Sequence, residues 1–197
     1  MNKKLESLYV KDVLPKNLTI FLTHLLMREH HARVLVGAKT DDEQVEGSMA
    51  VTGHSVIFDT VLERVWPFME SILGEELIPT YSYARLYVNG NELKIHKDRP
   101  SCEVSITIQL GRSHHYSWPI YMGEQRYDLA EGDGIIYNGV DISHYRKPAD
   151  GPEGYYSGQL FLHYVRANGS NKKYAGDQRW DGEMPFIKFR TADMETK

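Results

Sequence analysis

The spacing of apolar residues changes near residue 80, and this change limits the chain to a few kinds of fold. Before it, in residues 17–30 and 59–73, apolar side chains recur every three or four positions, as in amphipathic helices. After it, short segments alternate apolar and polar residues, and turn sequences such as NGN and EGDG separate them. Two helices followed by many short strands predict an α+β fold, an antiparallel sandwich or barrel with helices packed on one outer face.

Local signals indicate where these elements begin and end. Asn17 is available to cap the first helix, Pro67 is expected to kink the second, and Gly74 is expected to end it. Residues 38–53 are polar and predict a loop with a short edge strand. The predicted strands are YSYARLYV (81–88), EVSITIQL (103–110), WPIYM (118–122), QRYDL (125–129), GIIYN (134–138) and GQLFLHYV (158–165).

Length and composition favour one soluble domain. The chain has 197 residues, of which 41% are apolar, enough for a single core. We expect a helical buttress (1–79), a catalytic β-barrel core (80–165) and a polar C-terminal extension (166–197) that lies over the surface, with MPFIKF (184–189) returning to the domain.

Charge and cysteine content exclude several classes of protein. The net charge is -4 and no block of Lys or Arg occurs, so nothing indicates a nucleic-acid surface. No apolar run is long enough to span a membrane, and the N-terminal residues lack the apolar core of a secretory signal. Cys102 is the only cysteine, which excludes an intrachain disulfide and a cysteine-rich zinc site. We therefore expect a cytoplasmic protein.

The segment KIHKDRP, residues 94–100, places a histidine and an aspartate two positions apart. In a strand, His96 and Asp98 would leave the same face, which suggests a metal site or a hydrogen-bonded pair. His144 follows a later strand and turn, and a β-barrel can bring it close to the first two. Two histidines and one carboxylate form the facial triad of non-haem iron, which leaves coordination positions open.

With these motifs in order, residues 80–165 resemble the Fe(II)/2-oxoglutarate-dependent dioxygenases, and in particular the prolyl 4-hydroxylase-like branch. The resemblance rests on YVNGNELKIHKD, on EVSITIQL as the following strand, on EGDGIIY, and on HYRKP around the second histidine. It implies a double-stranded β-helix, the jelly-roll or cupin-like barrel, with His96, Asp98 and His144 as catalytic metal ligands. It also implies that 2-oxoglutarate chelates Fe(II) and is converted with O₂ to succinate and CO₂ while a substrate is hydroxylated, with ascorbate as a stimulant.

The sequence departs from the family pattern at one position. The family usually has an Arg or Lys about nine or ten residues after the second histidine, to pair with the far carboxylate of 2-oxoglutarate. Here those positions are Glu153 and Gly154. Arg146, on the same face as His144 in an extended segment, is the nearest substitute, and Arg85 is a second cationic candidate. Tyr87 matches a family tyrosine whose hydroxyl can contact the co-substrate.

Three functions stay open at this level. The first is an oxygenase that acts on a peptidyl prolyl residue, another peptide or protein, or a small molecule. The second is a cupin-type metal enzyme, although a cupin would usually have a His-x-His pair where this chain has Asp98. The third is a barrel that has lost co-substrate binding. Residues 36–53 and 111–125 are the candidate lids or rims; the sequence identifies neither the substrate nor the oligomeric state.

Overall fold

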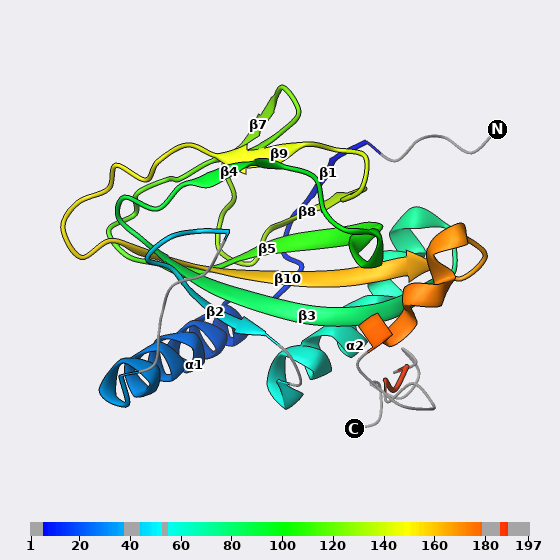
Figure 1. The fold of residues 1–197 in the computed structure, drawn as a ribbon, viewed down its shortest axis with the longest axis horizontal. Coiled ribbons are helices and arrows are strands. Elements are labelled where there is room, and N and C mark those ends of the chain that lie inside the picture. Colours follow the sequence, from blue (N-terminus) through cyan, green and yellow to red (C-terminus); the bar gives the residue numbers. More distant parts are fainter. Residues whose placement is uncertain (1–5, 38–43, 53–54, 179–185, 189–197) are drawn as a thin grey trace.

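The computed structural model describes residues 6–37, 44–52, 55–178 and 186–188. Two antiparallel sheets lie over one another, and two helices cover the outer face of the larger sheet (Figure 1). The larger sheet has the order β1 (Leu8–Val10), β8 (Gly134–Tyr137), β5 (Val104–Arg112), β10 (Tyr156–Arg166), β3 (Leu77–Val88) and β2 (Met49–Thr52). The smaller sheet has the order β4 (Leu93–His96), β9 (His144–Arg146), β6 (Ile120–Met122) and β7 (Gln125–Tyr127).

The helices α1 (Lys16–Leu35) and α2 (Val56–Leu73) share one apolar core with the larger sheet. This core contains Leu22 from α1, Leu62 and Met69 from α2, and one face of the long strands. Within the described residues, the remaining regular elements are the 3₁₀ segments η1 (Pro100–Cys102) and η2 (Ser170–Gln178). Neither α1 nor α2, the two α-helices of the described part, has the length and apolar character needed to cross a bilayer.

The helix ends follow the predicted signals only in part. Gly74 ends α2 in the left-handed conformation, as predicted. The predicted cap at Asn17 is wrong, because α1 begins at Lys16 and Asn17 lies within its first turn. Pro15 precedes that turn without a side-chain cap, and Ser55 caps α2 by accepting a hydrogen bond from the Phe58 amide. Pro67 lies inside α2, and the helix continues past it.

All six segments predicted as strands are present, and the described residues contain three further short strands, β1, β4 and β9. Each has three or four residues, too few for an alternating pattern to stand out, although the sequence suggested extended segments at His96 and His144. The predicted edge strand within residues 38–53 is β2, which pairs with β3, whereas 38–43 lie outside the described residues.

The C-terminal segment is attached to the domain more firmly than its polarity suggested. Segment η2 packs against β3, β10 and η1. Within the predicted docking segment 184–189, Phe186 packs on the helical core and the Ile187 amide donates to Glu63 at 2.9 Å. The rest of 179–197 lies outside the described residues.

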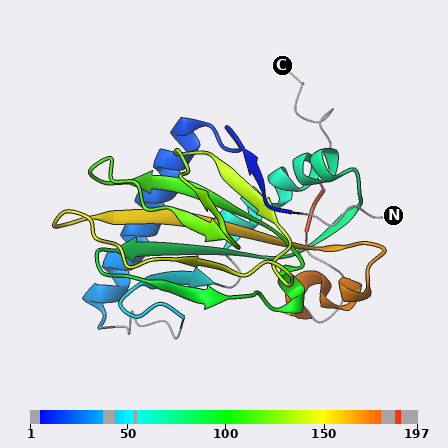
Figure 2. The same cartoon turned by 90° about the horizontal axis from the view of Figure 1, so that it is seen from above.

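The two faces of the long strands separate an apolar layer from a polar one. Even-numbered residues of β5 and β10, such as Ile106 and Leu160, lie in the core beneath the helices. Because side chains alternate along a strand, the odd-numbered residues point to the space between the sheets. Buried polar groups face that space, among them Thr107, Gln109 and Gln159. The space between the sheets is therefore polar. Figure 2 shows α1 behind the long strands, on the side of the apolar core.

We predict that α2 and the sheets unfold together. Leu62→Ala is expected to lower the free energy of unfolding by about 2–5 kcal/mol, since Leu62 is fully buried in the shared core. Urea unfolding would be followed by far-ultraviolet circular dichroism and by tryptophan fluorescence. Ile57→Ala, in the same helix but 37% exposed, is the control and should change stability by less than about 1 kcal/mol. Two transitions at different urea concentrations would contradict the single-domain prediction.

Candidate metal centre

The pairing of β4 with β9 brings two histidines together. His96 ends β4, His144 begins β9, and the two residues are direct partners in the antiparallel register. Their ring centroids are 4.2 Å apart. Asp98 completes the group, and one ligand atom from each of the three residues lies within 4.8 Å of the others. The structure thus brings together the three residues predicted from the sequence.

Asp98 reaches the site differently from the sequence prediction. We expected Asp98 to share a strand with His96, but β4 ends at His96. Asp98 lies in the segment that follows, where its amide donates to the Gly139 carbonyl at 2.8 Å. A Cβ atom at Gly139 would come within 2.5 Å of an Asp98 carboxylate oxygen and 2.3 Å of the Cys102 carbonyl, so only glycine fits there. A glycine contact, and not strand alternation, therefore places the carboxylate.

Backbone carbonyls fix the tautomer of both histidines. His96 Nδ1 lies 2.8 Å from the Lys94 carbonyl, and His144 Nδ1 lies 3.1 Å from the Ile142 carbonyl. A carbonyl only accepts, so each Nδ1 carries the hydrogen and each Nε2 has a lone pair that can accept a hydrogen bond or bind a metal. This arrangement leaves both Nε2 atoms ready to bind a metal ion.

Three hydrogen-bond acceptors face one another at this point. His96 Nε2 and His144 Nε2 lie 3.6 Å and 3.5 Å from Asp98 Oδ1. The other carboxylate oxygen, Oδ2, is buried and accepts no hydrogen bond from the described residues. Two atoms bound to one ion at about 2.1 Å would lie about 3.0–3.4 Å apart, close to the observed spacing. These donor atoms therefore fit a divalent cation of borderline character, such as Fe(II).

Burial makes the charge of this group costly without a cation. Burial raises the pKa of Asp98 to about 6, and the nearby His96 imidazole opposes this effect. Burial lowers the pKa of both histidines, and for His96 the neighbouring His144 lowers it further. The imidazoles are thus kept neutral, as metal ligands must be.

A second buried cluster lies further along the interior, around Arg146. Arg146 is 2% exposed and follows His144 on the same face of β9. Its guanidinium donates to the Trp118 carbonyl and lies 4.8 Å from the centre of the Trp118 ring. The Gln159 amide, oriented with its oxygen toward Arg146, accepts from Nη2 at 3.3 Å. No carboxylate among the described residues forms an ion pair with Arg146.

Two tyrosines complete this cluster. Tyr87 and Tyr155 are both buried, and their phenol groups are close enough to Arg146 to raise its pKa, whereas burial lowers it. The Tyr155 hydroxyl is buried and has no hydrogen-bond partner within the described part of the chain. A guanidinium without a carboxylate, next to an unused hydroxyl, is suited to an anionic ligand.

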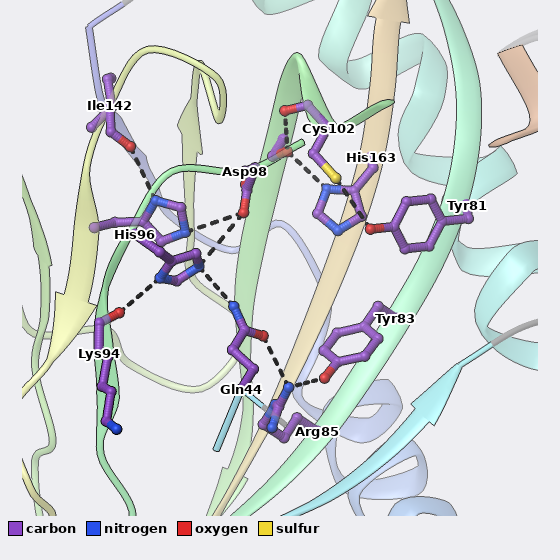
Figure 3. Close-up of polar contacts among 12 residues, drawn as sticks. Gln44, Tyr81, Tyr83, Arg85, Lys94, His96, Asp98, Cys102, Ile142 and His163 are labelled. Atoms are coloured by element: carbon purple, nitrogen blue, oxygen red, sulfur yellow. Dashed lines mark hydrogen bonds and ion pairs between the residues drawn. The ribbon is translucent and has the colours of Figure 1, made fainter. Parts of the chain in front are cut away.

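The other cationic candidate, Arg85, has different partners. Arg85 is 1% exposed and donates to Ser48 Oγ at 2.6 Å, to Gln44 Oε1 at 3.1 Å and to the Tyr83 hydroxyl. Gln44 in turn lies 2.9 Å from His96 Nε2, so Arg85 is connected to the histidine end of the interior (Figure 3).

Sequence reasoning missed the residues around Arg146 and His96. It did not name Trp118, Tyr155 or Gln159 near Arg146, and it did not name Gln44 near His96. Gln44 and Trp118 do fall in the two segments proposed as rims, 36–53 and 111–125, and Gln159 occupies an interior-facing position of a predicted strand. Their roles depend on side-chain contacts between segments far apart in the sequence, which the sequence alone does not reveal.

We predict that Asp98→Asn stabilises the metal-free protein. Because the folded-state pKa of Asp98 is raised from 3.8 to about 6, the ionised carboxylate destabilises the fold above about pH 6, by on the order of 3 kcal/mol. This cost grows as the pH rises from about 4 to about 6. Urea unfolding with a chelator should show Asp98→Asn to be more stable than the wild type at pH 7.5, with little difference near pH 4. A variant less stable than the wild type at pH 7.5 would refute the assignment of this cost to Asp98.

The comparisons with known proteins concern the fold. No protein-family model matches the chain, and no curated protein sequence matches it. Solved structures do match. A prolyl-4-hydroxylase from Pseudomonas putida has a TM-score of 0.61 at 18% identity, over 81% of this chain and 92% of its own. A viral collagen prolyl hydroxylase from Paramecium bursaria Chlorella virus-1, in complex with 2-oxoglutarate, has a TM-score of 0.60 at 10% identity, over 81% and 96%.

A third match is a prolyl hydroxylase from Trichoplax adhaerens in complex with a peptide fragment of a hypoxia-inducible factor. Its TM-score is 0.59 at 10% identity, over 86% of this chain and 85% of its own. These identities are too low to carry residue roles across, but the long coverage of both chains identifies the architecture. The chain has the double-stranded β-helix fold of the prolyl hydroxylases and other 2-oxoglutarate–Fe(II) oxygenases.

Proposed function

We propose that this protein is an Fe(II)- and 2-oxoglutarate-dependent oxygenase. The observation that supports this most strongly is the arrangement of one strand, β9, which carries His144 of the metal cluster and, two residues later, the buried Arg146. A metal-binding triad and an anion-binding guanidinium thus face the same interior. A chelating dicarboxylate can bind the metal at one end and the guanidinium at the other.

Each residue of the triad has a separate role in this proposal. His96 and His144 present neutral Nε2 atoms, and Asp98 supplies one negative charge. Together they would hold Fe(II) on one side and leave its other positions open. When bound, Fe(II) would supply the activation of O₂, of which one oxygen atom would enter succinate as CO₂ is released from 2-oxoglutarate and the other would hydroxylate the substrate.

Arg146 and its neighbours would bind the far carboxylate of 2-oxoglutarate. A guanidinium can grip a carboxylate with two hydrogen bonds, and the Tyr155 hydroxyl can supply another, with Tyr87 beside them. Trp118 and Leu93 belong to the apolar cluster around this position and would shield the ion pair from water. The pair would then be stronger than in solvent.

The substrate that we propose is a prolyl residue in a peptide. The support is the likeness to three prolyl hydroxylase structures, one of which holds a peptide. A small-molecule substrate is the alternative, and a screen of prolyl peptides by mass spectrometry for an added oxygen atom would test the proposal.

We predict that His96→Ala and Asp98→Ala abolish iron-dependent turnover of 2-oxoglutarate. Each change removes one of three metal ligands, so Mn(II) binding, measured by calorimetry, should weaken at least tenfold. Succinate formation should fall to background. His24→Ala on the exposed side of α1 is the matched control and should behave as the wild type. Turnover retained in either ligand variant would remove the site assignment.

We predict that Arg146→Met weakens 2-oxoglutarate binding at least about thirtyfold and leaves Mn(II) affinity nearly unchanged. Loss of a buried charged partner costs about 2–5 kcal/mol, and Met fills a similar volume. Binding would be measured by calorimetry on the Mn(II)-loaded protein. Arg126→Met is the control, because Arg126 is exposed and pairs with Asp128 at the surface. If Arg85→Met weakens binding and Arg146→Met does not, the far carboxylate is bound by β3 instead.

A further inference from the structure

Gln44 connects the metal centre to the buried Arg85. Its Nε2 atom lies 2.9 Å from His96 Nε2, and its Oε1 atom accepts from Arg85 Nη2 at 3.1 Å (Figure 3). Gln44 comes from the segment between α1 and β2, far in sequence from the three candidate ligands. The proposed function does not use this contact.

The two ends of the Gln44 amide cannot be exchanged. A guanidinium is only a donor, so the amide atom that faces Arg85 must be the carbonyl oxygen. The NH₂ group therefore faces His96, whose Nε2 has a free lone pair because Nδ1 donates to the Lys94 carbonyl. The Arg85 guanidinium is in turn held by hydrogen bonds to Ser48 and the Tyr83 hydroxyl and by contact with the rings of Tyr83 and Tyr87. The direction of the Gln44 N–H is thus set by a buried support.

A metal ion on His96 changes the acceptor for this N–H. The Nε2 lone pair would then belong to the metal bond, and the exposed Gln44 N–H would donate to another acceptor beside His96. Oxygen atoms bound to the metal next to His96 are such acceptors. The donor therefore lies next to the place where His96, Asp98 and His144 would hold a metal, and close to the coordination positions that they would leave open.

The residue after Gln44 reaches the other end of the interior. Val45 is 1% exposed and packs in the apolar cluster that contains Tyr87, Trp118 and Tyr155, next to Arg146. Two consecutive residues thus contact the metal end and the Arg146 end. In the proposed function, 2-oxoglutarate would lie between these two ends.

We propose that Gln44 is a co-substrate-binding residue, which donates a hydrogen bond to the 2-oxoglutarate oxygen that binds the metal beside His96. This inference rests on the proposed function and adds a residue to it. Arg85 acts as a positioning residue, because it fixes the orientation of the Gln44 amide and does not itself contact the ligand.

The test uses the full-length protein loaded with Mn(II) and calorimetric titration with 2-oxoglutarate. Gln44→Ala removes the donor and should weaken binding about tenfold or more. Gln44→Glu keeps the shape but places a carboxylate against the carboxylate of the ligand, so its loss should be larger. Mn(II) affinity should not weaken in Gln44→Ala, since the amide is not a metal ligand. Glu46→Ala, an exposed position on the same segment, is the matched control and should bind as the wild type.

A spectroscopic measurement separates a direct contact from a general disturbance of the segment. With Fe(II) and 2-oxoglutarate under anaerobic conditions, a hydrogen bond to the chelate changes the energy of its visible metal-to-ligand absorption. Gln44→Ala should shift that absorption, and Glu46→Ala should not. If both Gln44 variants bind 2-oxoglutarate within twofold of the wild type, this inference is overturned and the proposed function stands. If the Mn(II)-loaded wild type does not bind 2-oxoglutarate, both are overturned.

Discussion

The antiparallel pairing of β4 with β9 determines the candidate site, because it sets His96 opposite His144. Both imidazoles are then oriented by carbonyl groups of their own strand segments, at Lys94 and Ile142, and not by replaceable side chains. A shift of this pairing by one residue would turn one histidine away from the interior, since neighbouring side chains leave opposite faces of a strand. The position of both histidines therefore depends on the pairing register of β4 and β9. The smaller sheet has to be folded before these residues could bind a metal.

The second constraint is the cost of a polar interior. Two guanidinium groups, Arg85 and Arg146, are almost completely buried, and aromatic rings and neutral acceptors surround them. Asp98 adds a buried carboxylate, and its raised pKa shows that burial also disfavours the charged form of this group. Such groups are tolerated because the opposite face of the long strands packs on α1 and α2 in a large apolar core. Ligands that neutralise the buried charges should therefore stabilise the fold as they bind.

Sequence patterns predicted the parts of this structure that depend on local chemistry. Long alternating segments such as β3 and β10 and the helical stripe of α2 were recognisable, and the His-x-Asp motif identified two of the three clustered residues. The predictions that failed concern residues that are positioned by contacts between distant parts of the sequence. Asp98 is placed by Gly139, which lies far along the chain, and β9 is three residues long, too short to show a period. The sequence does not distinguish Tyr155 and Gln159 from other strand or loop residues, because only the fold brings them next to Arg146.

The first third of the chain takes part in the site as well as in the core. The segment between α1 and β2 supplies Gln44, Val45 and Ser48, which contact His96, the cluster around Tyr87, and Arg85 respectively. A chain limited to residues 80–165 would keep all three candidate ligands and Arg146, yet it would lose these contacts and leave the Arg85 guanidinium without its Ser48 and Gln44 acceptors. The predicted division into a helical buttress and a β-barrel core concerns only how the core is shared. It does not describe how the candidate site is assembled, because residues of the N-terminal segment contact His96 and Arg85 directly.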